Sequence, residues 1–211
     1  HPYLAHDLGR AEAFTRAFFR RKLTEVDDPL YSHQIRFQNS GRIQQLLSQS
    51  LRNEIAEGET PQQRLLNRLP RGFDHFSPLG KAQYLEIKTF LQGYLLHSQG
   101  DRMLMGNSVE GRFPFLDHRV AEFSARLPDR LRIRGLNEKY LLRKAAEPLL
   151  PPNIAKREKR PYRAPILKTF IGPGAPEYVH ELCSTEALVR AGLFNPKVTR
   201  ALLAKCVNNI N

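Results

Sequence analysis

Apolar residues recur at helical spacing along most of the chain, and prolines and glycines separate the segments in which they do so. This pattern predicts amphipathic helices over residues 7–25, 41–57 and 79–97, the second of which closes at Gly58. Residues 58–80, rich in proline and glycine, are expected to connect the second helix to the third. In the third helix the spacing predicts a core face of Ile87, Phe90, Leu91, Tyr94 and Leu95.

Capping residues and prolines predict shorter helices further along the chain. Asp117 is a suitable N-cap for a helix that stops at Pro128, and Asn137 for a helix that Pro148 ends. Between these two helices, residues 130–135 alternate leucine and isoleucine with arginine, which favours a short extended segment.

The last part of the chain also has a helical pattern. One helix is expected after Pro151 and Pro152, and two short helices after Glu177, separated by the turn at residues 192–196. With one weak strand and no alternation of strands and helices, the sequence predicts a mainly α chain.

The composition is that of a globular protein. The 211 residues are 41% hydrophobic and 26% charged, which is enough to form a core without disulfides or metals. Cys183 and Cys206 lie in no C-x-x-C pattern, which favours reduced thiols and a cytoplasmic location. We expect no membrane span and no signal peptide, because no long apolar run is present. A first residue of His1 rather than methionine indicates a fragment or a processed product.

The net charge of +12 favours an anionic partner: a nucleic acid, a phosphate-bearing small molecule or an acidic companion domain. No histidine stands at metal-ligand spacing from a cysteine, aspartate or glutamate, so no metal site is expected. The sequence also lacks a G-x-S-x-G elbow and a glycine-rich phosphate loop. If the chain handles a nucleotide, its phosphates must be held elsewhere.

Residues 100–119 interleave charged with bulky apolar side chains. Charged groups in such a setting are costly to bury unless they are paired or used in chemistry. One interpretation is therefore a group of buried or half-buried ion pairs, and the alternative is a salt-bridged corner between two helices. The charged residues are Asp101, Arg102, Glu110, Arg112 and Asp117.

A second block, KREKRPYRAPI at residues 156–166, carries five basic side chains. Tyr162 is its one aromatic residue, and Pro161 and Pro165 prevent a continuous recognition helix, so a nucleic-acid patch is weakly supported. A solvated charged surface and a loop that contacts a phosphate remain as alternatives. Spacing alone does not decide between them.

Four linked segments resemble the C-terminal synthetase domain of glutamine-hydrolysing asparagine synthetases. They are DRMLM at 101–105, EGRFPFLDH at 110–118, EKYLLRKAAEPLLP at 138–151 and RxKRPYRAP at 157–165. The resemblance is good over residues 90–206, which include a family-like tail, and loose over residues 1–90.

The resemblance implies an ATP-dependent amide ligase. In that family ATP adenylates the side-chain carboxylate of aspartate, and ammonia from glutamine, released by an N-terminal glutaminase domain, attacks the adenylate. The implied fold is an ATP-pyrophosphatase-type (adenine nucleotide hydrolase-like) α/β domain, of which residues 1–211 would be the helical C-terminal half. The family's S-G-G-x-D-S pyrophosphate loop and S-G-E-G-A-D segment are absent from the sequence. ATP and Mg²⁺ would therefore be bound mainly by a missing N-terminal half, and the fragment alone is expected to be inactive.

The resemblance also assigns site residues. Lys159 matches the family lysine that contacts phosphates during adenylation, a role that suits a compact and mobile charge. Asp101 and Arg102 match a pair that lines the amino-acid pocket. Nucleotide, aspartate and glutamine are then the small-molecule partners.

Four further residues are expected near this site. Glu110 and Arg112 would form a buried ion pair that supports the pocket wall. Lys139 and Arg143 lie four residues apart on one predicted helical face and would border the pyrophosphate exit, or simply face solvent.

Other functions stay open at this point. A related ligase could amidate another carboxylate or form a β-lactam, and a non-catalytic remnant could act as a scaffold. From a different class, a basic helical module could bind nucleic acid.

Overall fold

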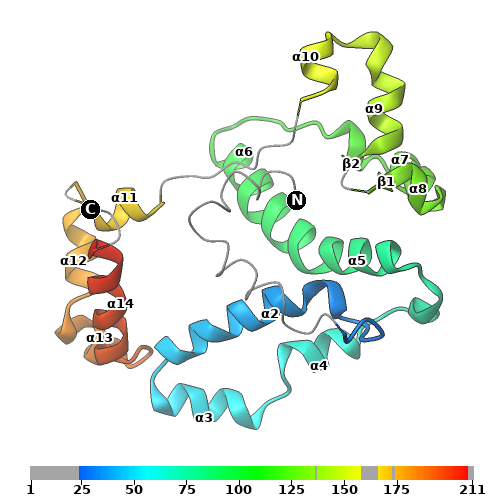
Figure 1. The fold of residues 1–211 in the computed structure, drawn as a ribbon. Helices are drawn as coiled ribbons and strands as arrows, with labels where there is room; N and C mark the ends of the chain where they lie inside the picture. The colour runs from blue at the N-terminus through cyan, green and yellow to red at the C-terminus, as the bar shows by residue number, and fades with distance from the viewer. Residues whose placement is uncertain (1–23, 136, 158–165, 173, 209–211) are drawn as a thin grey trace. The chain divides into compact units, whose positions relative to one another are not determined.

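The computed structural model describes residues 24–135, 137–157, 166–172 and 174–208 (Figure 1). The chain forms two compact units. Of the described residues, 24–34 and 70–157 belong to the first unit, and 35–69 and 166–208 belong to the second. Most described residues are helical, which confirms the prediction of a mainly α chain.

The core of the first unit forms around helix α5, which spans Pro78–Glu86. Leu30, Phe73 and Leu85 are buried there. His33, in the short 3₁₀ helix η1 (Tyr31–His33), is also buried and lies 2.9 Å from the carboxylate of Glu86 through Nε2. The N-terminus of α5 is capped by a serine hydroxyl, which accepts a hydrogen bond from the third residue of the helix.

Beyond α5 the chain continues as the π-helical segment η4 (Ile87–Asp101) and then as α6 (Arg102–Gly106). The predicted core face of this stretch is wrong. Ile87, Tyr94 and Leu95 are exposed, and Phe90 and Leu91 are half-buried. The prediction assumed α-helical geometry, in which residues three and four apart share one side, and this spacing does not hold where hydrogen bonds run from i to i+5.

The remaining elements of the first unit are short. Asp117 caps α7 by accepting a hydrogen bond of 2.9 Å from the backbone N–H of Arg119, and α7 ends just before Leu127 and Pro128, so both predicted ends are confirmed. In chain order these elements are η3 (Phe73–His75), η5 (Pro114–Leu116), α7 (His118–Arg126), α8 (Asp129–Arg132), β1 (Ile133–Arg134), β2 (Asn137–Glu138), α9 (Tyr140–Ala146), η6 (Glu147–Leu149) and α10 (Pro152–Ala155). The expected helix after Pro151 is thus present as α10.

Strands β1 and β2 form an antiparallel hairpin, with Ile133 opposite Glu138 and Arg134 opposite Asn137. Asn137 therefore does not cap a helix, as the sequence pattern predicted, because it is engaged in strand pairing and α9 begins three residues later. Gly135 takes a φ of 59° and so permits the tight turn between the strands. Of the predicted extended segment 130–135, the first residues are helical instead.

The second unit combines an early and a late part of the chain. Its elements are α2 (Gln34–Gly41), η2 (Arg42–Leu46), α3 (Gln49–Glu57), α4 (Pro61–Leu66), α11 (Ile166–Ile171), α12 (Glu177–Leu182), α13 (Thr185–Ala191) and α14 (Pro196–Asn208). The two parts meet where Leu47 pairs with Phe194 in an isolated β-bridge. The backbone N–H of Ser48 donates to the carbonyl of Leu193 at 2.9 Å, and that of Asn195 donates to Leu46 at 2.7 Å.

This bridge interrupts the helix predicted over residues 41–57. Leu47 is extended and Ser48 caps a new helix, α3, by accepting a hydrogen bond from Leu51. The apolar spacing was compatible with one continuous helix, but the backbone groups at the break bond to the turn near Phe194 instead. The predicted end at Gly58 is confirmed.

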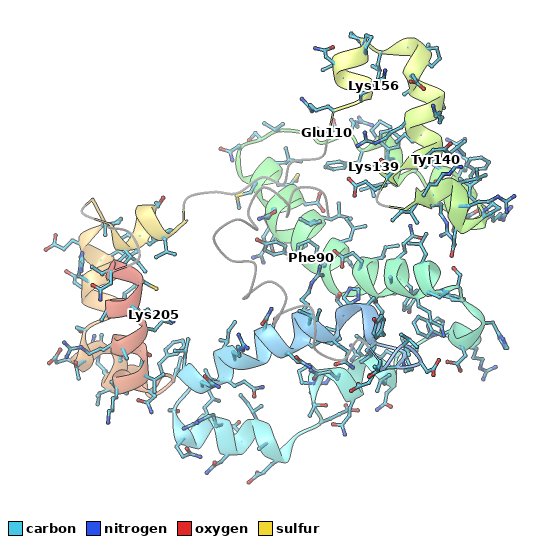
Figure 2. All side chains as sticks on the ribbon, viewed as in Figure 1. Phe90, Glu110, Lys139, Tyr140, Lys156 and Lys205 are labelled. Atoms are coloured by element: carbon cyan, nitrogen blue, oxygen red, sulfur yellow. The ribbon has the colours of Figure 1, made fainter. Side chains whose placement is uncertain are left out.

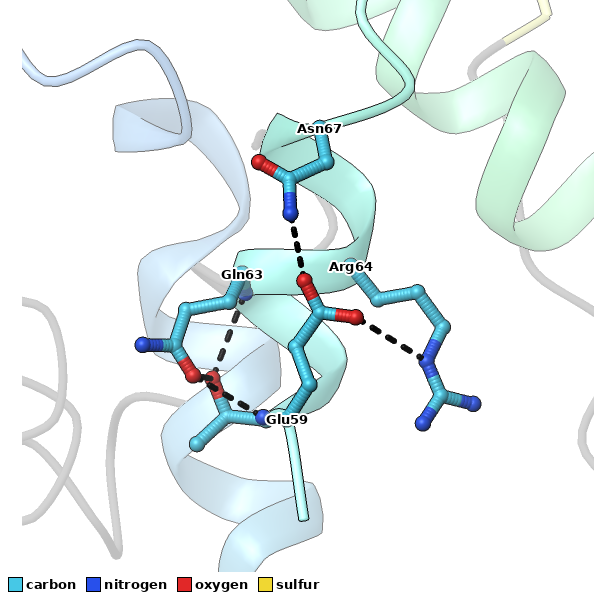
Figure 3. Close-up of polar contacts among 5 residues, drawn as sticks. Glu59, Gln63, Arg64 and Asn67 are labelled. Atoms are coloured by element: carbon cyan, nitrogen blue, oxygen red, sulfur yellow. Dashed lines mark hydrogen bonds and ion pairs between the residues drawn. The ribbon is translucent and has the colours of Figure 1, made fainter.

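The predicted connection 58–80 contains an additional helix, α4. Thr60 and Gln63 form a reciprocal capping box at its start, as Figure 3 shows. Glu59 adds contacts to Arg64, at 3.8 Å, and to Asn67 on the same helix.

After Glu177 three helices follow, where the sequence pattern predicted two. The turn at residues 192–196 does separate α13 from α14, and Gly192 takes the left-handed φ of 67° that ends α13. The helix predicted over residues 7–25 falls almost entirely on residues 1–23, outside the described part of the chain.

Two findings concern the cysteines and the apolar character of the helices. Cys183 and Cys206 are both free thiols. Among the described helices, none combines the length and the apolar character needed to cross a bilayer.

The position of the core predicts how two neighbouring substitutions differ. Leu85→Ala removes a fully buried side chain and should lower the free energy of unfolding by roughly 2–5 kcal/mol. Ile87→Ala, at a side chain that is 49% exposed, should lower it by about 1 kcal/mol or less. Urea denaturation of the two variants measures this difference, and an equal or larger loss for Ile87→Ala would contradict the assignment of the core to α5.

Candidate functional site

All site residues predicted from the sequence that the structure describes lie in the first unit. Asp101 is the last residue of η4 and Arg102 is the first of α6. Both are exposed, and within the described residues neither side chain has a hydrogen bond or ion pair. They therefore present a carboxylate and a guanidinium whose hydrogen-bonding capacity is not used inside the described chain.

Glu110 and Arg112 do form an ion pair, with Oε1 and the guanidinium 2.6 Å apart. The prediction that the pair is buried is wrong, because the side chains are 74% and 82% exposed. The pairing is between near neighbours in an irregular segment, which allows both groups to remain in water. Elsewhere in residues 100–119, Asp101 and Arg102 are exposed, whereas Asp117 is half-buried and is paired with Arg119.

Asp117 and Arg119 form a second local pair in the same block. The arginine donates through Nε to Oδ1 at 3.0 Å and through its terminal nitrogen to Oδ2 at 2.8 Å. Hydrogen bonding from the Arg119 side chain, and then from its backbone N–H, lowers the pKa of Asp117 below its ordinary value. The same carboxylate raises the pKa of Arg119.

Lys139 and Arg143 do not share a helical face as predicted. Lys139 precedes α9 as its N-cap in the left-handed conformation, with a φ of 55°, and its carbonyl accepts the backbone N–H of Arg143 at 2.9 Å. Figure 2 shows Lys139 and Tyr140 at the start of this helix. Lys139 is thus not part of the helix that carries Arg143.

The Arg143 guanidinium donates to the backbone carbonyl of Arg157 at 3.1 Å. This contact joins α9 to the first residues of the basic block that begins at Lys156. Lys159, the predicted catalytic residue, lies outside the described residues, two positions further along the sequence. The structure thus brings one of the predicted phosphate-facing residues to the border of the segment that carries Lys159.

Sequence reasoning missed several contacts around the hairpin and α9. Arg134 donates to the phenol oxygen of Tyr140 at 2.9 Å, and its guanidinium lies 5.4 Å from the centre of that ring. Lys144 and Glu147 pair at 3.0 Å, which raises the pKa of the lysine and lowers that of the glutamate. The Lys144–Glu147 pair could have been predicted from the sequence, because residues three apart are neighbours on a helix surface.

The chemistry of the described groups suits anions better than metal ions. Lys139, Arg143 and Lys156 are cations at or near the surface of α9 and α10. Over the described residues no group of three histidine, cysteine, aspartate or glutamate side chains is placed to hold a metal.

Comparisons with known proteins agree on one family. The sequence model of the family described as asparagine synthase matches residues 3–209. The chain is 41% identical over 91 residues to asparagine synthetase [glutamine-hydrolyzing] 1 of Bacillus subtilis (strain 168), covering 43% of this chain and 14% of that protein. It is 36% identical over 91 residues to a putative asparagine synthetase [glutamine-hydrolyzing] of Mycobacterium bovis, again covering 43% of this chain and 14% of that protein.

A relative with a different name is also similar. Amidase chyE of Penicillium rubens is 33% identical over 136 residues, covering 61% of this chain and 20% of that protein. The chain thus spans between 14% and 20% of the length of these curated relatives. No solved structure matches it.

The Asp117–Arg119 pair predicts a defined pH dependence. Because the pKa of Asp117 is lowered in the folded chain, its contribution to stability is present above the ordinary aspartate pKa and is lost as the pH falls through the lowered value. An NMR titration of the Asp117 carboxyl carbon should show this low pKa, and Arg119→Gln should move it back towards the ordinary value. An unchanged pKa in Arg119→Gln would contradict the role of the guanidinium.

Proposed function

Since this chain belongs to the asparagine synthase family, we propose that it forms part of an ATP-dependent amidotransferase that converts aspartate to asparagine. The observation that carries this proposal is the family match, which extends over residues 3–209. The relatives from Bacillus subtilis and Mycobacterium bovis that are named as glutamine-hydrolysing asparagine synthetases support glutamine as the ammonia source.

The proposed reaction has two steps. An oxygen of the aspartate side-chain carboxylate attacks the α-phosphorus of ATP, and pyrophosphate leaves. Ammonia then attacks the activated carbonyl carbon, the bond from that carbon to the phosphate-bearing oxygen breaks, and asparagine and AMP are released. Negative charge builds up on the phosphates in the first step, and a cation placed against it there lowers the barrier.

Lys159 supplies that cation in this proposal. Its support is the match of its segment to the family pattern, together with the hydrogen bond that anchors Arg157 to α9 through Arg143. Arg143 and Lys139 add positive charge for the departing pyrophosphate.

Asp101 and Arg102 recognise the amino acid in this proposal. Their exposed carboxylate and guanidinium, which have no partner among the described residues, are complementary to the ammonium and α-carboxylate groups of aspartate. The Glu110–Arg112 pair lies in the same part of the chain and is exposed to solvent. All four residues come from one stretch of the first unit.

The chain acts as one part of a synthetase domain in this account. It contributes the helical portion of an ATP-pyrophosphatase-type α/β fold, and a longer polypeptide contributes the pyrophosphate loop, the Mg²⁺ ligands and the glutaminase domain. The lack of an S-G-G-x-D-S motif in the sequence supports this division. The free thiols of Cys183 and Cys206 support a reducing compartment, the cytoplasm.

A second candidate is amidation of a carboxylate other than aspartate. The similarity to the relative named amidase chyE favours it, because that similarity extends over 61% of this chain. Pyrophosphate exchange measured with aspartate and with a series of other carboxylic acids distinguishes the two candidates. Exchange that depends on another acid and not on aspartate would favour the second.

We expect Lys159→Ala, in the protein that carries this chain, to reduce aspartate-dependent exchange between ATP and pyrophosphate by about 100-fold or more. The reason is the loss of charge stabilisation in the adenylation step. Hydrolysis of glutamine should continue, because it uses a different domain. The measurement is incorporation of labelled pyrophosphate into ATP.

Lys156→Ala is the matched control, because it removes a lysine from the same basic block at an exposed position. Its exchange rate should stay within about twofold of the original. Normal exchange in Lys159→Ala, or an equal loss in Lys156→Ala, would overturn the role given to Lys159.

A further inference from the structure

An apolar groove of about 570 Å³ opens in the first unit, between α7, α8, the β-hairpin and α9. Its wall is made mainly of aromatic and aliphatic side chains, among them Phe115, Val120, Phe123 and Leu142. They come from η5, α7 and α9. No step of the proposed amidation uses them.

The apolar wall of the groove is in contact with water. Phe115 is 69% exposed and Phe123 is 61% exposed, and Val120 and Leu142 are exposed as well. Single exposed apolar residues are ordinary on protein surfaces, but a contiguous group that lines a concave surface is typical of an interaction site. Covering it removes apolar area from water, which favours binding of an apolar partner.

The charge around the groove is positive. Between Asp117 and Ala146 there are eight lysine and arginine residues and four acidic ones, a net charge of +4. Arg126, Arg130 and Lys139 have no acidic partner in the described part of the chain, and all three are exposed. Lys139 lines the groove, and the two arginines stand next to lining residues in the sequence.

We infer that this groove is a docking site for an acidic polypeptide segment, which places apolar side chains against Phe115 and Phe123. Acidic residues of the segment then meet Lys139, which lines the groove, and the excess of positive charge on the surrounding residues. A second copy of this chain fits poorly, because each copy carries a net charge of +12. This inference is independent of the ligase reaction.

The binding of designed peptides tests the inference. The probe is an amphipathic helical peptide with leucine on one face and glutamate on the other, labelled with a fluorophore for anisotropy. A matched peptide carries lysine in place of every glutamate, and a third carries serine in place of every leucine. We expect the 211-residue chain to bind the acidic peptide at least tenfold more tightly than either of the others, with an affinity that falls as salt is raised.

Variants of the chain locate the binding surface. Phe123→Asp should weaken binding of the acidic peptide at least tenfold. Leu149→Asp should not, because Leu149, which is also an exposed apolar residue (81%), lies outside the groove. Lys139→Glu should weaken it several-fold, whereas Lys205→Glu, the same charge change on α14 (Figure 2), should have little effect. Circular dichroism confirms that each variant is folded, which is expected because these side chains are exposed.

Three results would overturn the inference. The first is equal binding of the acidic and basic peptides, and the second is equal weakening by Phe123→Asp and Leu149→Asp. The third is occupancy of the groove by something else. Sedimentation would then show dimers of the chain that dissociate in Phe123→Asp, or the chain would bind benzamide in a Phe123-dependent way and bind none of the three peptides.

Discussion

The first unit depends on the burial of one side of α5. Along nine residues this helix places Leu85 in the core, Tyr84 against the ring of Phe73 at 5.6 Å, and Glu86 on the buried His33. The cap of the same helix, Ser77, donates to Asp129 at 3.1 Å and so connects α5 to α8. These contacts join three distant stretches of sequence, and the segments with the candidate site residues extend from this support.

The parts of the fold that follow from local chemistry were predictable. Asp117 caps α7, a proline ends it, and glycine closes α3 and α13, because each of these effects acts within one turn of the chain. The spacing of apolar residues was less informative, since it does not distinguish an α-helix from the wider turns of η4. It also does not reveal a β-bridge to residues far away in the sequence, such as the bridge at Leu47. The Thr60–Gln63 capping box was readable from the sequence but was overlooked within a proline-rich connection.

In the candidate site, too, local features were predictable and features set by distant residues were not. The pairing of Glu110 with Arg112 was expected from the family resemblance, but its exposure depends on what packs over an irregular segment, which no local pattern encodes. Lys159 was predicted to be catalytic because its segment resembles a family pattern. The spacing of charges alone does not distinguish it from the other basic residues of the same block. We propose two uses for the large positive charge of the chain, namely phosphates near Lys159 and an acidic segment at the groove, and Lys139 contributes to both.

The central claim is that the longer protein activates a carboxylate by joining one of its oxygens to the α-phosphorus of ATP. Aspartate labelled with ¹⁸O in its side-chain carboxylate tests this most directly, with AMP and inorganic phosphate analysed by mass spectrometry after turnover with glutamine and ATP. The account predicts that one labelled oxygen appears in AMP and none in phosphate. Label in inorganic phosphate, accompanied by ADP, would show activation at the γ-phosphorus and would contradict it.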